Sequence, residues 1–279
     1  MDIQTFLENN IDLVDDDRFE ELYAACHDDN HGRLTEVLLA CGINPLEYLK
    51  TVPRKFAAES TIEEIVIPPN IKGIQEDAFD QCNSLKHIEI PDSVKFIGNF
   101  AFYDCTGLES ISFGSAVQSI GDIAFCYCYN LKRVDIDNLQ SWCECEFTSM
   151  KSTPFCDADP DLYVNGTLVT DLVIPVGTSV IKDYAFAYCG IKSLHVPDTV
   201  GGIGKKAFYG CPELTDITLG KGVSYIDHGA FRRCNRLTHI TFEGTQQQWH
   251  RIIMTHASFE PDMDITVDCI DGSFLLETV

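Results

Sequence analysis

The chain has 279 residues, of which 45% are hydrophobic, so it is long enough to bury a large core. Its formal net charge is −23, from 43 acidic and 20 basic residues, and such a chain repels phosphate backbones and anionic lipid headgroups; we therefore expect no nucleic-acid partner. No stretch approaches the roughly 18 apolar residues of a membrane-spanning helix, so we also expect no membrane span.

Residues 1–61 show helical patterns and no repeat. Residues 15–26 begin with three aspartates suited to an N-cap and place their apolar residues on one helical face. A second helix is predicted over residues 33–41, ending at Gly42, and a third begins at Asn44-Pro45. We expect a small helical N-terminal cap, because the open end of a stack of repeats must be covered. A separate docking domain is the alternative.

A 23-residue pattern begins at Ile62 and defines a first repeat array over residues 62–136. Its aliphatic residues alternate along a short segment, which predicts a strand with one apolar face, and a proline then ends the strand. The following alanine, phenylalanine and cysteine are residue types that pack well inside a protein. One copy consists of Leu85, Ile88, Ile90, Pro91, Val94, Ile97, Ala101, Phe102 and Cys105. Stacked coils can bury these groups together, each adding one strand to a parallel sheet.

Residues 137–168 interrupt the pattern. The alanine-phenylalanine-cysteine half of the coil is replaced by a segment carrying Trp142 and by a loop rich in proline and aspartate, and Asn165-Gly166 then predicts a tight turn. We interpret this stretch as an irregular insertion with a Trp-bearing turn. The repeat resumes over residues 169–279, a second repeat array with a C-terminal cap, where Trp249 follows a strand in the same way.

The pattern L-x-x-I-x-I-P-x-x-V-x-x-I-x-x-x-A-F-x-x-C resembles the BspA-like leucine-rich repeats of bacterial surface and phage-associated proteins. The resemblance covers roughly residues 62–245, and the Trp-bearing segments are similar to inserts in that family. It implies an α/β solenoid of leucine-rich repeats with a parallel β-sheet on one face. Members are mostly described as adhesion or protein-binding proteins, so it also implies a binding role at a cell surface.

The 13 cysteines are an odd number, and six of them occupy the repeat position, where we expect burial. Cys126-x-Cys128 and Cys143-x-Cys145 could form a four-sulfur metal site. Cys128 is an ordinary repeat cysteine, however, and this spacing is untypical of structural zinc, so we interpret the four as buried or incidental thiols. With no nucleophile elbow, zincin motif or phosphate loop either, the sequence predicts no catalytic residue, no cofactor and no metal.

The polar side chains on the outward face of the predicted sheet are the better candidates for function. They are Glu64, His87, Glu89, Arg133, Asp135, Asp171, His195, Asp216, Thr218, His239 and Thr241. This candidate binding face has few aromatic anchors, and a purely solvated face is the alternative.

The sequence therefore predicts a non-enzymatic protein-binding or adhesion scaffold whose partner is a host, cell-surface or virion protein. The alternative is a structural component of a larger assembly such as a phage particle, docked through the N-terminal helical region. The first residues lack the basic and apolar segments of a secretory signal, so we expect a cytoplasmic or virion-associated protein as encoded, and only the resemblance points to the cell surface. The oligomeric state stays open.

Overall fold

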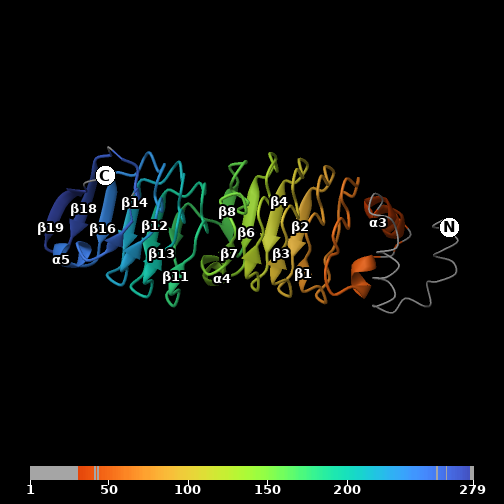
Figure 1. The fold of residues 1–279 in the computed structure, drawn as a ribbon, viewed down its shortest axis with the longest axis horizontal. Helices are drawn as coiled ribbons and strands as arrows, with labels where there is room; N and C mark the ends of the chain where they lie inside the picture. The colour runs from red at the N-terminus through yellow and green to blue at the C-terminus, as the bar shows by residue number, and fades with distance from the viewer. Residues whose placement is uncertain (1–30, 41, 43, 256, 262, 277–279) are drawn as a thin grey trace.

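A computed structural model describes residues 31–40, 42, 44–255, 257–261 and 263–276. The described chain winds into an elongated stack of coils that runs from the α3 end to the β19 end (Figure 1). Each regular coil contributes one longer strand to one sheet and a two-residue strand to a second sheet. The buried side chains of successive coils form one continuous hydrophobic core.

The longer strands form one sheet in each array, and their neighbours are parallel because every coil completes a full turn. Apolar and polar residues alternate, so Ile88 and Ile90 are buried while His87 and Glu89 are exposed. In each sheet only the last pair is antiparallel. The first sheet contains β2 (His87–Ile90), β4 (Ser110–Phe113), β6 (Arg133–Ile136), β8 (Asp161–Val164) and β9 (Thr167–Leu168). The second contains β10 (Asp171–Val173), β12 (Ser193–Val196), β14 (Asp216–Leu219), β16 (His239–Phe242), β18 (Ile265–Cys269) and β19 (Gly272–Leu276).

The two-residue strands form a further pair of parallel sheets. Two of them begin with glycine for a packing reason: a Cβ at Gly73 would lie 2.1 Å from the Phe96 ring, and one at Gly202 would lie 1.9 Å from the Tyr225 ring. The next coil therefore covers these positions with an aromatic side chain. One sheet contains β1 (Gly73–Ile74), β3 (Phe96–Ile97), β5 (Ser119–Ile120) and β7 (Glu146–Phe147); the other contains β11 (Val180–Ile181), β13 (Gly202–Ile203), β15 (Tyr225–Ile226) and β17 (Ile253–Met254).

The repeat phenylalanines and cysteines form two ladders through the core. Phe79 and Phe102 stack with ring centroids 5.0 Å apart, and Phe186 and Phe208 with centroids 5.4 Å apart. Four of the six repeat cysteines, namely Cys105, Cys128, Cys211 and Cys234, donate their S–H to a phenylalanine carbonyl of the preceding coil, as Cys105 does to Phe79 at 3.0 Å. Cys82 donates to the carbonyl of Ala57 instead. The predicted burial of the alanine, phenylalanine and cysteine positions is confirmed. The carbonyls that receive these thiols lie in the turns, where no strand partner reaches them.

The expected α/β class is wrong in its helical part, because the described chain is a β-solenoid with little helix. Two residues per coil have left-handed backbone, such as Asp77 and Gln81, each with φ of 55° on either side of Ala78-Phe79. A left-handed residue cannot continue a right-handed helix, so this half of the coil is a series of turns. The described helical segments are α3 (His31–Ala40), the 3₁₀ helix η2 (Pro45–Tyr48), α4 (Leu139–Cys143) and α5 (Gln246–Trp249).

The N-terminal part that the structure describes lies against the first coil. Thr35 of α3 donates to the carbonyl of Phe56 at 2.5 Å, and Asn70 donates to the carbonyls of Leu46 and Leu49. Stacking begins before residue 62, because Val52 forms a parallel bridge with Ile74. The helices expected at residues 33–41 and from Asn44 correspond to α3 and η2, whereas the one expected over residues 15–26 lies outside the described residues.

The strand expected in the first coil, around residues 64–67, is not formed. The alternating burial is present, with Ile65 and Ile67 inward, but the segment has no ladder to β2. The side chain of Asn44 donates to the carbonyl of Val66 at 2.8 Å, and two consecutive prolines follow Ile67. A carbonyl bonded to a side chain and a proline without N–H both weaken strand pairing.

The two arrays have separate sheets, since β9 and β10 belong to different ones, yet they share the core. Each array closes in the same way, with a Trp-bearing helix, a two-residue strand and a β-hairpin: α4, β7 and β8–β9 in the first, α5, β17 and β18–β19 in the second. Across the junction, the indole N–H of Trp142 donates to the carbonyl of Ala185 at 2.8 Å. None of the described helices has the length and apolar character needed to cross a membrane.

Candidate functional site

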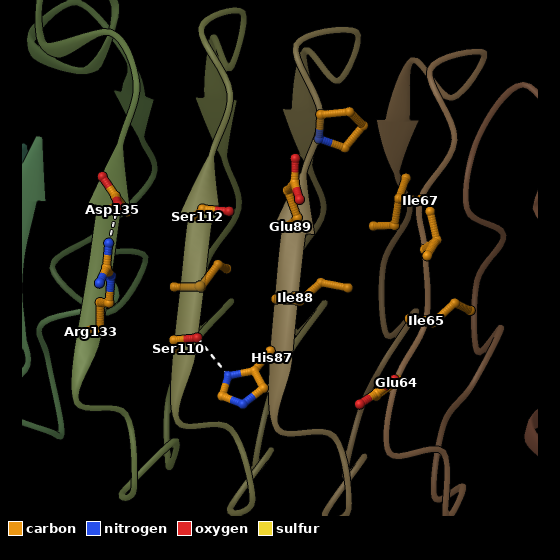
Figure 2. A pocket seen from close by; sticks show the side chains of 13 residues that line it. Glu64, Ile65, Ile67, His87, Ile88, Glu89, Ser110, Ser112, Arg133 and Asp135 are labelled. Carbon is orange, nitrogen blue, oxygen red and sulfur yellow. Dashed lines mark hydrogen bonds and ion pairs between the residues drawn. The ribbon is translucent and has the colours of Figure 1, made fainter. Parts of the chain in front are cut away.

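A hollow of about 550 Å³ lies on the outer face of the first long sheet, between the segment 64–67 and strands β2, β4 and β6 (Figure 2). The strand alternation places polar side chains here, because every second residue points away from the core. Five predicted site residues line it together: Glu64, His87, Glu89, Arg133 and Asp135. We call this region the acidic hollow, since three of these five are acids.

Arg133 and Asp135 form one wall of the acidic hollow as a paired unit. Their charged groups are 2.6 Å apart, and the guanidinium of Arg133 lies 3.9 Å from the ring centroid of Tyr163. The other carboxylate oxygen of Asp135 accepts the backbone N–H of Gly166 at 3.1 Å. Asp135 points outward as predicted but is only 8% exposed, because Arg133 and the β8–β9 turn cover it. Its carboxylate therefore fixes the turn and is not available to a ligand.

Glu64 and Glu89 are the accessible acids. Both are exposed, and neither side chain makes a hydrogen bond or an ion pair with another described residue. Val66 lines the same hollow, is 74% exposed and supplies an apolar surface. His87 shares a hydrogen bond of 2.7 Å with Ser110. The accessible part of the hollow thus combines free carboxylates with an apolar patch.

A second hollow of about 450 Å³ adjoins the first and shares Glu89 and Pro91 with it. It adds two further acids, Asp92 and Asp137. Hydrogen bonds from the backbone and hydroxyl of Ser115 lower the pKa of Asp92, which keeps this carboxylate charged. Burial raises the pKa of Asp137, and the neighbouring Asp135 raises it further. The adjoining surface extends the negative charge of the acidic hollow.

The six candidate residues of the second array are not part of the acidic hollow. Asp171, Asp216 and His239 lie in one row across β10, β14 and β16, and His195, Thr218 and Thr241 lie in the next row. Asp171 accepts from the hydroxyls of Ser193 and Thr170, which lower its pKa. His239 lies 3.4 Å from Asp268 and shares a hydrogen bond with Thr241. Asp216 likewise accepts from the hydroxyl of Thr215, so both aspartates and His239 have polar partners in or next to their own sheet.

The four cysteines considered as a metal site from the sequence do not lie together in the structure. Cys128 donates to the carbonyl of Phe102 inside the core, while Cys126 lies beside Cys156. Cys143 and Cys145 are buried in and next to α4. The 11 cysteines within the described ranges are all free thiols. Sequence reasoning missed Cys156 because the loop that carries it has no repeat position.

A family model for the "BspA type Leucine rich repeat region" matches residues 50–156 and 160–256, in six copies. The chain belongs to this family. BspA type repeats thus account for both arrays, and the match reaches back to residue 50, where the structure shows stacking ahead of Ile62. A comparison with curated protein sequences gives no match.

Solved structures similar to this BspA type chain are bacterial leucine-rich repeat proteins. A leucine-rich repeat protein of T. pallidum (TpLRR) is 22% identical with a TM-score of 0.35, over 66% of this chain and 74% of that one. The pneumococcal vaccine antigen PcpA is 19% identical with a TM-score of 0.43, over 71% of this chain and 60% of that one. A leucine-rich repeat protein of Bacteroides ovatus is 22% identical with a TM-score of 0.25, over 62% and 59%.

Proposed function

We propose that this chain is a non-enzymatic protein-binding or adhesion scaffold, and that its acidic hollow binds a basic segment of a partner protein. Its family is one of repeat scaffolds, which is consistent with protein binding in general. The observation that carries the finer proposal is the pair of free, exposed carboxylates, Glu64 and Glu89, beside the exposed Val66.

Charge complementarity favours a lysine or arginine side chain in this hollow. The aliphatic stem of such a side chain covers apolar surface such as Val66, while its charged end reaches a carboxylate. Arg133 does not neutralise the free acids, because its guanidinium is paired with Asp135 and lies over Tyr163. The chain's net charge of −23 further attracts a basic partner over longer distances.

We also propose that the helical N-terminal region covers the open end of the solenoid. Leu38, Leu46 and Leu49 are buried against the first coil, which supports a covering role for residues 31–49. A terminal coil without a cover would expose core side chains and unpaired backbone groups.

A random peptide library tests the binding proposal. Peptides are selected on the full-length chain, and their affinities are compared for the wild type and the variant Glu64→Lys/Glu89→Lys. We expect selected peptides to be enriched in lysine and arginine, and the variant to lose at least about tenfold in affinity, because like charges then face each other.

The matched control is Asp171→Lys/Asp216→Lys, which makes the same change in net charge on the second array. We expect this variant to keep most of its affinity for the peptides and to lose only the part that comes from long-range attraction by the net charge. Equal losses of affinity in both variants would mean that net charge, and not the acidic hollow, attracts the peptides. Selected peptides without lysine or arginine would contradict the proposed partner chemistry.

A further inference from the structure

Three potential metal ligands meet at a turn of the third coil. The sulfur atoms of Cys126 and Cys156 are 3.8 Å apart, and the ligand atoms of Cys126, Cys156 and Asp157 all lie within 4.8 Å of one another. Cys126 comes from the turn after Ala124-Phe125, whereas Cys156 and Asp157 come from the loop of the insertion. Residues 30 positions apart in the chain thus form one cluster.

We propose that Cys126, Cys156 and Asp157 bind a zinc ion. Zinc–sulfur bonds of about 2.3 Å in tetrahedral geometry put two sulfur ligands about 3.8 Å apart. A disulfide would bring the same atoms to about 2.05 Å. The two thiols share a hydrogen bond at 3.8 Å, so they already lie at the separation that tetrahedral coordination requires. Two thiolates and a carboxylate also suit Zn²⁺, a borderline-soft cation, better than Ca²⁺ or Mg²⁺, which take oxygen ligands.

The surroundings hold the three groups in place. Asp157 accepts the backbone N–H of Tyr127 at 2.8 Å through one carboxylate oxygen, which orients the group and leaves the other oxygen for a metal. Phe155, next to Cys156, is 1% exposed and anchors the loop in the core. Cys126 is buried in the regular turn. A site fixed on both sides needs little rearrangement to take up an ion.

The ion would connect the irregular loop to the regular coil. Binding deprotonates both thiols and releases two protons to solvent, so zinc affinity rises with pH. Two thiolates and a carboxylate carry three negative charges, of which Zn²⁺ offsets two. Three protein ligands also leave a fourth position, which a water molecule or an outside group fills.

Titration with Zn²⁺ alone tests the site, using the full-length chain after reduction and removal of metals with a chelator. We expect one zinc ion per chain by calorimetry, and thiolate-to-metal charge-transfer absorption when Co²⁺ replaces zinc. Cys126→Ser and Cys156→Ser each should lower the affinity by at least about 100-fold, and Asp157→Asn by about 10- to 100-fold. Cys269→Ser is the control, because Cys269 is a half-buried free thiol outside the cluster, and it should bind zinc normally.

Circular dichroism shows whether the buried Cys126 variant folds, and Asp157→Asn tests the site without touching the core, because Asp157 is exposed. Zinc should also slow alkylation of Cys126 and Cys156 in the wild type, measured by mass spectrometry. No zinc uptake by the reduced wild type, or unchanged uptake in both cysteine variants, would overturn the proposal. A Cys126–Cys156 disulfide in a chain that binds no zinc when reduced would do the same.

Discussion

The buried cysteines of the repeat must stay neutral in the folded protein. Burial raises the pKa of Cys82 to about 11 and that of Cys189 to about 12, because a thiolate has no water in the core. Burial likewise raises the pKa of Cys145 to about 12. An unfolded chain exposes the same thiols and ionises them near their ordinary pKa of 9.0. Folding and thiol ionisation therefore oppose each other.

We predict that the free energy of unfolding falls as the pH rises above about 9, because the unfolded chain then releases thiol protons that the folded chain retains. One thiol whose pKa is raised on folding contributes a slope of up to about 1.4 kcal/mol per pH unit between its two pKa values, and its stabilisation is complete below 9. Cys189→Ala should be less stable than the wild type at pH 8 and lose less on going to pH 11. Urea unfolding at both values measures this. Parallel pH profiles for the two proteins would contradict it.

Which residues line the acidic hollow could be predicted largely from alternation along the strands, since Glu64, His87, Glu89 and Arg133 point outward as expected. The covering of Asp135 could not be predicted, because the turn that covers it together with Arg133 belongs to the insertion and includes Gly166. The insertion has no repeat, so its partners are decided by three-dimensional packing. The contact of Cys126 with Cys156 could not be predicted from the sequence for the same reason.

At the scale of elements, the turns of each coil depend on left-handed residues that are mostly not glycine. The residue before each alanine-phenylalanine pair has positive φ, at 55° for Asp77, 56° for Phe100, 59° for Ile123 and 65° for Tyr184. The inward positions of the repeat share an apolar character and could be predicted. These turn positions share no chemical property, so their left-handed backbone could not be predicted, and the α/β class implied by the resemblance stood uncorrected until the structure showed turns here.

We predict that Ile123→Asn stabilises the protein by about 0.5–1 kcal/mol. A left-handed conformation costs an ordinary residue about 1–2 kcal/mol and is worst for a β-branched one, whereas asparagine tolerates it. The loss of half-buried apolar surface offsets part of this gain. Ile123→Val is the control, because it keeps the β-branch and removes one methylene, and it should be slightly destabilising. Urea unfolding measures both, and an asparagine variant no more stable than the valine variant would argue against strain at this turn.

At the scale of the whole molecule, the two arrays have separate sheets, so they unfold together only if the contacts at their junction are stable. In a solenoid each coil contacts its neighbours alone, so stability passes from one array to the other through the junction coil. The indole of Trp142 packs on Phe113 and Phe147 of the first array and donates to Ala185 of the second. Lys182 adds a backbone hydrogen bond to Cys143 and an ion pair with Glu146. The break in the 23-residue period could be read from the sequence, but these contacts across the junction could not.

We predict that Trp142→Phe uncouples the two arrays. The variant leaves the buried carbonyl of Ala185 without its donor, which costs about 1–3 kcal/mol, and the smaller ring leaves a void beside Phe113 and Phe147. Hydrogen exchange should then show β10 and β11 losing protection before β4 and β6, and the urea unfolding transition should broaden or split into two.

Trp249→Phe is the matched control. Trp249 lies in the equivalent short helix at the end of the second array, and only the terminal hairpin follows it. It should lower stability at β18 and β19 without separating the arrays. A Trp142→Phe protein that still unfolds in one transition, with unchanged relative protection, would mean that the continuous core couples the arrays without this hydrogen bond.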